Sequence, residues 1–569
     1  MVPATWQTTT AAPAQHETAQ QDETAQRDET AQRDGTAYAG WGDPSRRPGL
    51  PPHALSFLAG TVGLGAPSRP VPLDQVKLPA AALSPAVRAE LVALLGPAAV
   101  ADDAATRVRH AAGRSYLDLL ALRSGAPREA PDAVLLPADP AQVAAVLAVC
   151  QRARVAVVPW GGGTSVVGGV RPERGSAVAV VALDLRRLDR LLHVDPVSRT
   201  AVLEAGVRAP RADALLAGHG LALGHLPQSY EQVTLGGCAA TRSAGQASTG
   251  HGRFDEMVVG LVLQTPAGEL RVGRGAPSAA GPSLLGLALG SEGAYGVITE
   301  VTVRVRPLPE VQRYEGLSFR GWDDGLGALR QIVQDGVAPD VVRLCDPAET
   351  RVQQALAGPG GPRARAGRAL LDVRGHGAGC LAVVGWSGSR AAVAARRRAA
   401  RPVLRGHGAL RLGTGVGERW ARGRYAAPYL RDDLLDHGLL VETLETAAPW
   451  SRLEAVRAAV RAALEDALRD TPPAVLCHVS HLYPHAASLY VTVLARQSSD
   501  PYAQWQRAKA AASAAVVASG ATITHHHAVG TDHRDFLPAE VGPLGVEVLT
   551  AVKAVLDPTG ILNPGTLLP

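Results

Sequence analysis

The feature that most constrains the fold is a glycine-rich turn that directly follows a short apolar run. Residues 155–158 read Val-Ala-Val-Val, and residues 159–166 then read Pro-Trp-Gly-Gly-Gly-Thr-Ser-Val. Three successive glycines remove every Cβ, permit positive φ and leave backbone N–H groups free to converge on an anion. The turn has neither the Gly-x-Gly-x-x-Gly spacing of a Rossmann motif nor the Gly-x-x-x-x-Gly-Lys-Ser/Thr spacing of a P-loop. Taken alone, it is compatible with a pyrophosphate cradle or with a plain turn between strands.

Further glycine-bearing turns follow at intervals, each beside a short apolar segment. Residues 234–237 read Thr-Leu-Gly-Gly, residues 242–245 read Arg-Ser-Ala-Gly, and residues 290–299 read Gly-Ser-Glu-Gly-Ala-Tyr-Gly-Val-Ile-Thr. Glycine allows a backbone or a ligand to approach closely, so several such sites indicate one large ligand.

The order of these turns resembles the vanillyl-alcohol-oxidase type of FAD-binding fold, and residues 557–565 resemble its C-terminal return. The resemblance implies an α+β, two-lobed fold in which a separate substrate-binding cap domain faces the FAD-binding domain. It also implies FAD as the cofactor, and because no histidine lies in residues 159–166 we expect noncovalent binding. The FAD contacts expected from the resemblance are Pro159, Trp160, Gly161, Gly162, Gly163, Thr164, Ser165, Pro227, Ser229, Thr234, Gly236, Gly237, Thr241, Ser243, Gly245, Glu292, Gly296, Val297 and Ile298.

Composition limits the class of protein. The chain has 569 residues, 46% of them hydrophobic, and a formal net charge of +5, which is too slight to indicate nucleic-acid binding. No run of about 18 uncharged apolar residues is present, and residues 1–10 lack the features of a secretory signal. We therefore expect a cytoplasmic protein with peripheral membrane contact as an option. The five cysteines are scattered, as is typical of reduced structural thiols: Cys150, Cys238, Cys345, Cys380 and Cys477.

Patterning along the chain predicts its organisation. A six-residue repeat over 17–34 has no apolar face beyond alanine, so residues 1–37 are predicted to be disordered. Start signals at Ser84 and Asp139 predict capped helices, and β-rich runs predict strands, including one at 297–305. We expect five parts: a low-complexity tail (1–37), an N-terminal helical extension (38–130), the FAD-binding domain (131–308), the cap domain (309–545) and a C-terminal segment returning to the FAD domain (546–569).

Three features of the second lobe carry candidate chemistry: Tyr490, the triplet His525–His527 and Arg431. In the alternation of residues 489–494, Tyr490 shares a strand face with Thr492, so its phenol is predicted to face a cavity or to pack as a core tyrosine. The three histidines fall in an expected strand-to-loop stretch and would point alternately to opposite faces. A surface polar cluster is the alternative.

These features sharpen the resemblance to the alkyldihydroxyacetonephosphate synthase family, FAD enzymes that make the ether bond of ether lipids. The motifs that carry it lie at 40–42, 110–115, 224–229, 342–346, 442–450 and 525–527. The resemblance implies exchange of the acyl group of acyl-dihydroxyacetone phosphate, a small lipid substrate, for a fatty alcohol through a flavin N5 adduct.

The same resemblance implies roles for particular residues. Tyr490 would take the proton from the substrate carbon, and His525, His526 and His527 would assist its movement. Arg431 and Arg343 would hold the phosphate, for which the guanidinium fork is suited.

A second enzyme class remains open. His478 and His485 have the spacing of paired metal ligands in FAD-linked 2-hydroxyacid dehydrogenases, and His526 lies near the position of a third ligand. The Gly-Asp-Gly-Asn sequence that lies between the paired histidines of those dehydrogenases is absent here, so under the synthase hypothesis we expect no bound metal. The alternative function is a D-2-hydroxyacid dehydrogenase of the lactate or glycolate type.

Association with other surfaces is the last expectation. Residues 391–405 carry five arginines on an alanine-rich helix that would suit either an anionic lipid surface or a solvated face. We also expect a homodimer.

Overall fold

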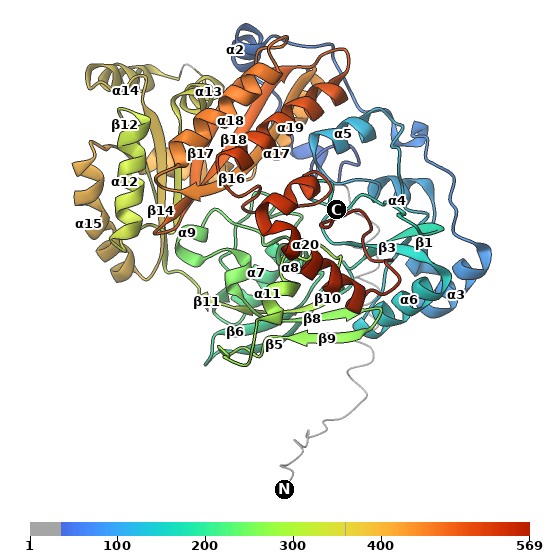
Figure 1. The fold of residues 1–569 in the computed structure, drawn as a ribbon. Coiled ribbons are helices and arrows are strands. Elements are labelled where there is room, and N and C mark those ends of the chain that lie inside the picture. The colour runs from blue at the N-terminus through green and yellow to red at the C-terminus, as the bar shows by residue number, and fades with distance from the viewer. Residues whose placement is uncertain (1–35, 359) are drawn as a thin grey trace.

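The computed structural model describes residues 36–358 and 360–569, so the predicted tail lies outside the described residues except for Thr36 and Ala37. Within these ranges the chain forms two mixed α/β layers in the N-terminal half and a large sheet in the C-terminal half (Figure 1). The glycine turns of the first half and the open face of the large sheet lie toward each other.

The first sheet contains the strand that leads into the glycine turn. Its order is β1 (Val100–Ala101), β2 (Ala133–Leu135), β4 (Ala179–Asp184) and β3 (Val155–Trp160). Strands β2, β4 and β3 run parallel, and the C-terminal segment joins them through a parallel bridge between Val157 and Leu562. Parallel strands need crossover connections, and α6 (Pro140–Ala153) supplies the one into β3.

The start signals in this region are confirmed. The Asp139 side chain accepts a hydrogen bond from the Gln142 backbone N–H and so caps α6, and Ser84 caps α3 (Pro85–Leu95) through the Val87 N–H. Proline occupies the first turn of both helices, where its missing N–H has no intrahelical partner to lose.

The second sheet is antiparallel and carries the later glycine turns at its edge. Its order is β5 (Leu191–Asp195), β6 (Thr200–Glu204), β10 (Val297–Arg304), β8 (Val258–Thr265) and β9 (Gly268–Val272). A short pair, β11 (Arg306–Pro307) with β7 (Leu221–Ala222), forms a separate two-stranded sheet. The helices around it are α7 (Ala209–Ala217), α8 (Leu235–Thr241), α9 (Ser248–His251), α10 (Phe254–Met257) and α11 (Leu284–Ala288).

The cap sheet is fully antiparallel. Its order is β15 (Leu410–Gly413), β12 (Val311–Phe319), β14 (Cys380–Gly388), β13 (Val341–Cys345), β17 (Ala474–Leu482), β18 (Ala486–Arg496) and β16 (Leu439–Pro449). One face packs under the helices α12 (Trp322–Gln334), α15 (Arg390–Gly406), α18 (Leu453–Ala467) and α19 (Pro501–Ala518), which bury the largest apolar cluster (Figure 1).

The remaining helices connect or cover these sheets. They are α2 (Pro52–Val62), α4 (Ala104–Arg109), α5 (Tyr116–Arg123), α13 (Pro347–Ala357), α14 (Pro362–Val373), α16 (Thr414–Gly423), α17 (Ala427–Asp436) and α20 (Leu537–Leu556), with short 3-10 helices at Pro44–Arg46, Leu73–Gln75, Pro97–Ala99 and Arg534–Phe536. In the described part of the chain no helix combines the length and apolar character that crossing a bilayer requires.

Strand alternation gives the cap sheet two different faces. In β18, Leu489, Val491 and Val493 belong to the cluster beneath the helices, whereas Tyr490 and Thr492 point the other way, toward a cavity. The predicted shared face of Tyr490 and Thr492 is therefore confirmed.

The five cysteines are all buried and unpaired. Two lie in the N-terminal layers, on α6 and α8, and three lie in the cap sheet, on β13, β14 and β17. Burial raises the pKa of the Cys150 and Cys238 thiols to about 12, as expected for structural rather than reactive groups.

Candidate functional site

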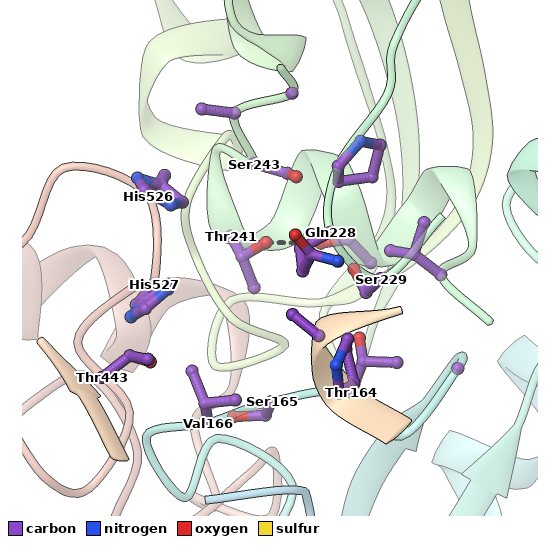
Figure 2. A pocket seen from close by; sticks show the side chains of 18 of the residues that line it. Thr164, Ser165, Val166, Gln228, Ser229, Thr241, Ser243, Thr443, His526 and His527 are labelled. Atoms are coloured by element: carbon purple, nitrogen blue, oxygen red, sulfur yellow. Dashed lines mark hydrogen bonds between the residues drawn. The ribbon is translucent and has the colours of Figure 1, made fainter. Parts of the chain in front are cut away.

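A cavity of about 440 Å³ lies between the glycine turns and the open face of the cap sheet. Figure 2 shows His526, His527 and Thr443 on one side, opposite Thr164 and Ser229 on the other. We call the side formed by the glycine turns the cofactor half, and the side formed by β16, β17, β18 and residues 524–530 the cap half.

The cofactor half presents unpaired backbone donors. Within the described residues, the N–H groups of 161–166 donate to no protein acceptor. The glycines there are required by space as well, since a Cβ on Gly162 would lie 2.1 Å from the backbone oxygen of Gln232. A row of free N–H groups on a cavity wall fits the pyrophosphate of a dinucleotide such as FAD.

Most of the expected FAD contacts line this cavity, with one exception. Val297 does not line it; the alternation of β10 turns its side chain into the core with Val157 and Leu562. The expected contacts that do line the cavity are Pro159, Trp160, Gly161, Gly162, Gly163, Thr164, Ser165, Pro227, Ser229, Thr234, Gly236, Gly237, Thr241, Ser243, Gly245, Glu292, Gly296 and Ile298.

Glu292 ties the cofactor half to the histidine segment. Its two carboxylate oxygens accept hydrogen bonds from the backbone N–H groups of Val529 and Gly530, each at 2.8 Å. Burial raises the pKa of Glu292 to about 7 in spite of these bonds. The residue itself adopts φ 51°, a conformation that non-glycine residues rarely take.

The cap half is organised in rows across three strands. Strand register sets His478 of β17 and Glu445 of β16 on either side of Tyr490 of β18. Two residues further along each strand, the next row contains Thr443, Thr492 and Leu476. Opposite residues of antiparallel strands share a face, so both rows lie on the cavity side of the sheet, and all of their members except Glu445 line the cavity.

The character of the wall changes from polar to apolar along the strands. Beyond the threonine row, Val441 and Leu494 belong to an apolar cluster that includes residues of α2, α13 and α17. The members that also line the cavity are Leu58, Val352, Leu356, Leu430, Leu434, Val441, Leu476 and Leu494. At about 3.4 Å per residue, Leu494 lies roughly 14 Å from Tyr490 along β18.

Tyr490 is enclosed by imidazole rings. The ring of His478 stacks on it with centroids 4.9 Å apart, and His526 and His527 lie at 6.1 Å and 5.6 Å. Burial raises the pKa of Tyr490, and a hydrogen bond with Thr443 opposes that shift. Its phenol is therefore protonated at neutral pH.

The histidine segment differs from the expectation. Residues 523–527 form no strand but a turn whose backbone N–H groups converge on the carboxylate of Glu445. His526 and His527 line the cavity, whereas His525 does not; its ring packs against Tyr483 instead. Burial lowers the pKa of both His525 and His527 to about 3, which leaves these two imidazoles neutral.

The two expected phosphate ligands differ in their partners. Arg343 on β13 lines the cavity, but its guanidinium is bound to Glu349, which also accepts from His478. Arg431 on α17 donates to the backbone oxygen of Arg114 at 2.8 Å and, among the described residues, forms no ion pair. Arg431 is the cation left available for an anionic ligand.

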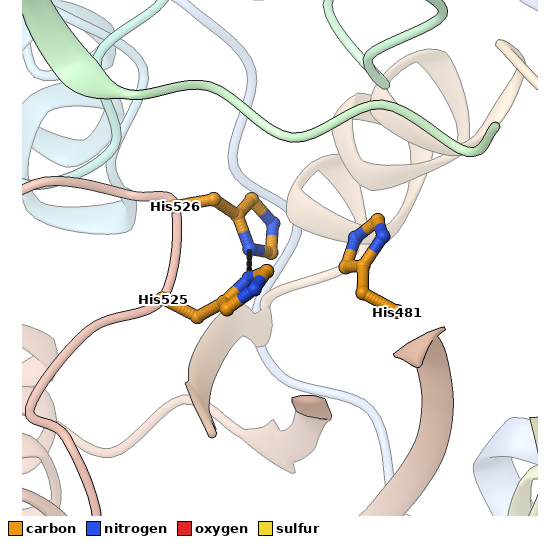
Figure 3. A group of neighbouring side chains, drawn as sticks. All are labelled: His481, His525 and His526. Carbon is orange, nitrogen blue, oxygen red and sulfur yellow. Dashed lines mark hydrogen bonds between the residues drawn. The ribbon is translucent and has the colours of Figure 1, made fainter. Parts of the chain in front are cut away.

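The metal pair of the alternative hypothesis is not assembled. His478 is bound to Glu349, and His485 is exposed because the turn from Tyr483 to Ala486 carries it away from the cavity. A different group, His481, His525 and His526, brings ring nitrogens within 4.8 Å of one another (Figure 3).

Both ring nitrogens of His525, the central member of this trio, already take part in hydrogen bonds. Nδ1 of His525 lies 3.0 Å from Nδ1 of His526, and Nε2 of His525 lies 2.7 Å from the Tyr483 hydroxyl. The Nδ1 atom of His481 is buried without a partner. The trio has suitable donors for a metal such as zinc, but binding would require His525 to give up one of its hydrogen bonds.

Several residues of the site carry no signal in the sequence by themselves. Thr443 and His481 reach the cavity only through strand pairing, and the apolar residues of α2 and α13 only through packing. Glu445 does not line the cavity; strand pairing brings it beneath the histidine turn. The only clue to Glu445 among these residues was its charge within the strand, since a buried charge requires partners, and Glu442 of the same strand carries the same signal.

Comparisons with known proteins agree with this geometry. The family described as FAD binding domain matches residues 131–273, and the family described as FAD linked oxidases, C-terminal domain, matches residues 308–567. The alkyldihydroxyacetonephosphate synthase of Dictyostelium discoideum is 32% identical over 84% of this chain and 80% of that protein. Glycolate oxidase subunit GlcD of Escherichia coli is 28% identical over 78% of this chain and 84% of that protein.

Solved structures extend the likeness to the whole fold. An alkyldihydroxyacetonephosphate synthase structure covers 93% of this chain and 97% of its own, with a TM-score of 0.79 and 27% identity. A p-cresol methylhydroxylase structure, at 17% identity, covers 84% of this chain and 96% of its own with a TM-score of 0.62 and is similar in fold alone.

Proposed function

Because the chain belongs to the alkyldihydroxyacetonephosphate synthase family of FAD-dependent enzymes, we propose that it exchanges the acyl group of acyl-dihydroxyacetone phosphate for a fatty alcohol. The observation that carries this proposal is the cavity wall that runs from a polar, histidine-rich row at Tyr490 to an apolar end at Leu494. Such a wall suits a ligand with a reactive polar head and a long apolar tail.

FAD, held noncovalently by the backbone donors of 161–166, would supply the electrophile that activates the substrate carbon beside the Tyr490 row. The lining residues of the loop contain no histidine or cysteine that could form a covalent link to the flavin. Glu292 lies at the junction and keeps residues 529–530 against the cofactor half.

The chain's own part in the reaction is to move a proton. Tyr490 is protonated at neutral pH, so it accepts a proton from the substrate carbon only as its own proton passes to a neighbouring imidazole. His478, His526 and His527 all pack against its ring and line the cavity. Since His478 is hydrogen-bonded to Glu349, His526 and His527 are the imidazoles assigned to take up the proton.

The phosphate and the tail have separate anchors. Arg431 would bind the phosphate, because it lines the cavity and, among the described residues, no carboxylate forms an ion pair with it. Asp432 and Glu442 lie near enough to feel its charge. Arg343, held by Glu349, would add positive potential and keep His478 against Tyr490. The tail would lie along β16 and β18 toward α2 and α13, where leucine and valine side chains form the wall.

The test is to follow the flavin spectrum of the purified protein under anaerobic conditions while acyl-dihydroxyacetone phosphate is added. Bleaching with release of fatty acid, and incorporation of a fatty alcohol without any electron acceptor, is the expected result. An unchanged spectrum and no fatty acid release would contradict the proposal.

A D-2-hydroxyacid dehydrogenase is the second candidate, and the His481, His525 and His526 trio is the observation that favours it. The similarity to glycolate oxidase subunit GlcD agrees with it. Bleaching by D-lactate or glycolate, reversed by an electron acceptor and abolished by a chelator, would establish this function and exclude the first.

Peripheral membrane contact is proposed through α15. Arg396 and Arg397 are bound to Asp340 and Glu315, so the exposed arginines 398, 401 and 405 would face the lipid. The homodimer stays a prediction.

A further inference from the structure

The carboxylate of Glu445 lies at the centre of the histidine turn. Its Oε2 accepts from the His525 backbone N–H at 2.8 Å, and its Oε1 accepts from the N–H groups of His526 and His527 at 3.1 Å and 2.9 Å. The Thr524 hydroxyl adds a further bond at 2.5 Å. The Glu445 side chain is fully buried.

These bonds explain why the turn forms there. Successive N–H groups that point to one side create a concave anion site, and here a side chain of the same protein fills it. Three backbone N–H groups and Nδ1 of His526 face this carboxyl group, and such a set of donors favours its ionised form against the burial that opposes it. The group is therefore a carboxylate, and each bond it accepts is charge-assisted.

The same carboxylate fixes where the proton of His526 lies. Nδ1 of His526 is 3.2 Å from Oε2 of Glu445, and a carboxylate offers only acceptors, so this nitrogen carries the proton. Nδ1 of His525 then serves as an acceptor, and its own proton lies on Nε2, which donates to the Tyr483 hydroxyl. In neutral His526 the unprotonated nitrogen is therefore Nε2.

We propose that Glu445 is the positioning residue of this site: it shapes the His525–His527 turn and holds His526 in the tautomer whose Nε2 is free to take up a proton. The inference rests on the proposed function for its reaction. As the substrate carbon gives its proton to the Tyr490 oxygen, the phenolic proton passes to Nε2 of His526, and the imidazolium that forms is neutralised by Glu445. Glu445 acts through His526 and does not contact the substrate.

A double-mutant cycle tests this claim on the FAD-loaded protein. Glu445→Gln should lower kcat by about 100-fold, within the range of lost proton-transfer catalysis, while KM changes by less than about threefold. His526→Ala should cause a loss of similar size. If Glu445 acts through His526, the double variant should lose no more than His526→Ala alone, to within about threefold. The inference would be overturned if the loss in the double variant equalled the product of the two single losses, or if Glu445→Gln kept normal activity.

Matched variants separate positioning from general destabilisation. Glu442 is a second buried glutamate of β16, but it lies on the opposite face and accepts from the Tyr116 backbone. Glu442→Gln should lower Tm comparably and leave the proton-exchange step, measured as solvent deuterium entering the substrate, within about threefold of normal. Thr524→Val, which removes one bond but keeps the carboxylate, should reduce exchange only a few-fold. Losses that simply follow Tm across all three variants would overturn the inference.

The structural arm remains informative if the wild-type protein fails to process the acyl substrate, which would refute the proposed function. In a crystal structure of Glu445→Gln, the ring of His526 and the backbone of 524–527 should be displaced, because an amide cannot accept on both sides. Rings and backbone that stay in place would refute the role of Glu445 whatever the substrate is.

Discussion

The cofactor half of the cavity is built from backbone, whereas the cap half is built from side chains. Residues 161–166 offer N–H groups from one continuous turn, and the glycines serve mainly to keep space clear. In the cap half, Tyr490, His478 and Glu445 come from three strands and meet only through register. A backbone site can be encoded by a few neighbouring residues, but a side-chain site depends on the whole sheet.

Two buried glutamates, Glu292 and Glu445, illustrate the difference between the halves, because both accept hydrogen bonds from backbone N–H groups of residues 525–530. Glu292 faces no cation, so burial raises its pKa to about 7. Glu445 faces imidazoles, which hold its pKa well below the usual range despite its burial. At neutral pH Glu445 is therefore ionised, whereas Glu292 is close to the midpoint of its titration.

The largest expected effect comes from filling the space of the cofactor half. Gly162→Ala places a Cβ 2.1 Å from the backbone oxygen of Gln232, a contact that no side-chain movement relieves. We expect the variant to purify without FAD and without activity, as measured by its absorbance spectrum. Gly406→Ala, where nothing lies within 4 Å, is the control and should keep full FAD content. Normal flavin content in Gly162→Ala would mean that the turn is not the cradle.

A change in the cap half should separate turnover from cofactor binding. Tyr490→Phe removes the phenol but keeps the ring between its imidazole neighbours. We expect activity to fall by about 10²- to 10⁴-fold with FAD content unchanged. Thr492→Val, on the same face of the strand, should change activity only a few-fold. Activity that survives in Tyr490→Phe, or a loss of FAD, would remove the assigned role.

Glu292→Gln should alter how stability depends on pH. The folded protein holds the Glu292 proton up to about pH 7, whereas the unfolded chain releases it near 4.5, so this group's stabilising contribution is lost as pH rises through that window. The lost contribution is on the order of 3 kcal/mol. The variant lacks this titration, so its Tm relative to wild type should rise between pH 4.5 and 7. A pH-independent difference in Tm would contradict the raised pKa.

The smallest effect is expected at the junction of the two halves. Ala528 adopts φ 74°, in the left-handed region where a Cβ is strained. Ala528→Gly should therefore stabilise the protein by about 1 kcal/mol, measured by denaturant unfolding. In contrast, Ala399→Gly on the exposed face of α15 should destabilise it by about the same amount. Destabilisation by Ala528→Gly would show that the strain is relieved elsewhere.

The contrast also explains what the sequence could and could not predict. The capped helix after Asp139 and the glycine turn after β3 depend on residues within a few positions of each other, and both were readable. The histidine segment was wrongly expected to begin as a strand, because β-branched Ile523 and Thr524 favour one locally. Its actual turn depends on Glu445, 80 residues away.

The alternative hypothesis of a metal pair fails for a related reason. Spacing alone set His478 and His485 together, but the tight turn from Tyr483 to Ala486 exposes His485 to solvent. Val297 illustrates the effect of strand alternation on a smaller scale, since its side chain lies in the core whereas the neighbouring Gly296 and Ile298 line the cavity.

The five buried cysteines allow the local opening of each half of the molecule to be followed separately. A thiol with a raised pKa in a closed core reacts with an alkylating reagent only during an opening that exposes it. The alkylation rates of Cys150 and Cys238 would report how often the N-terminal layers open. Those of Cys345, Cys380 and Cys477 would report how often the cap sheet opens. The order in which the cysteines are alkylated therefore shows which half of the molecule opens first.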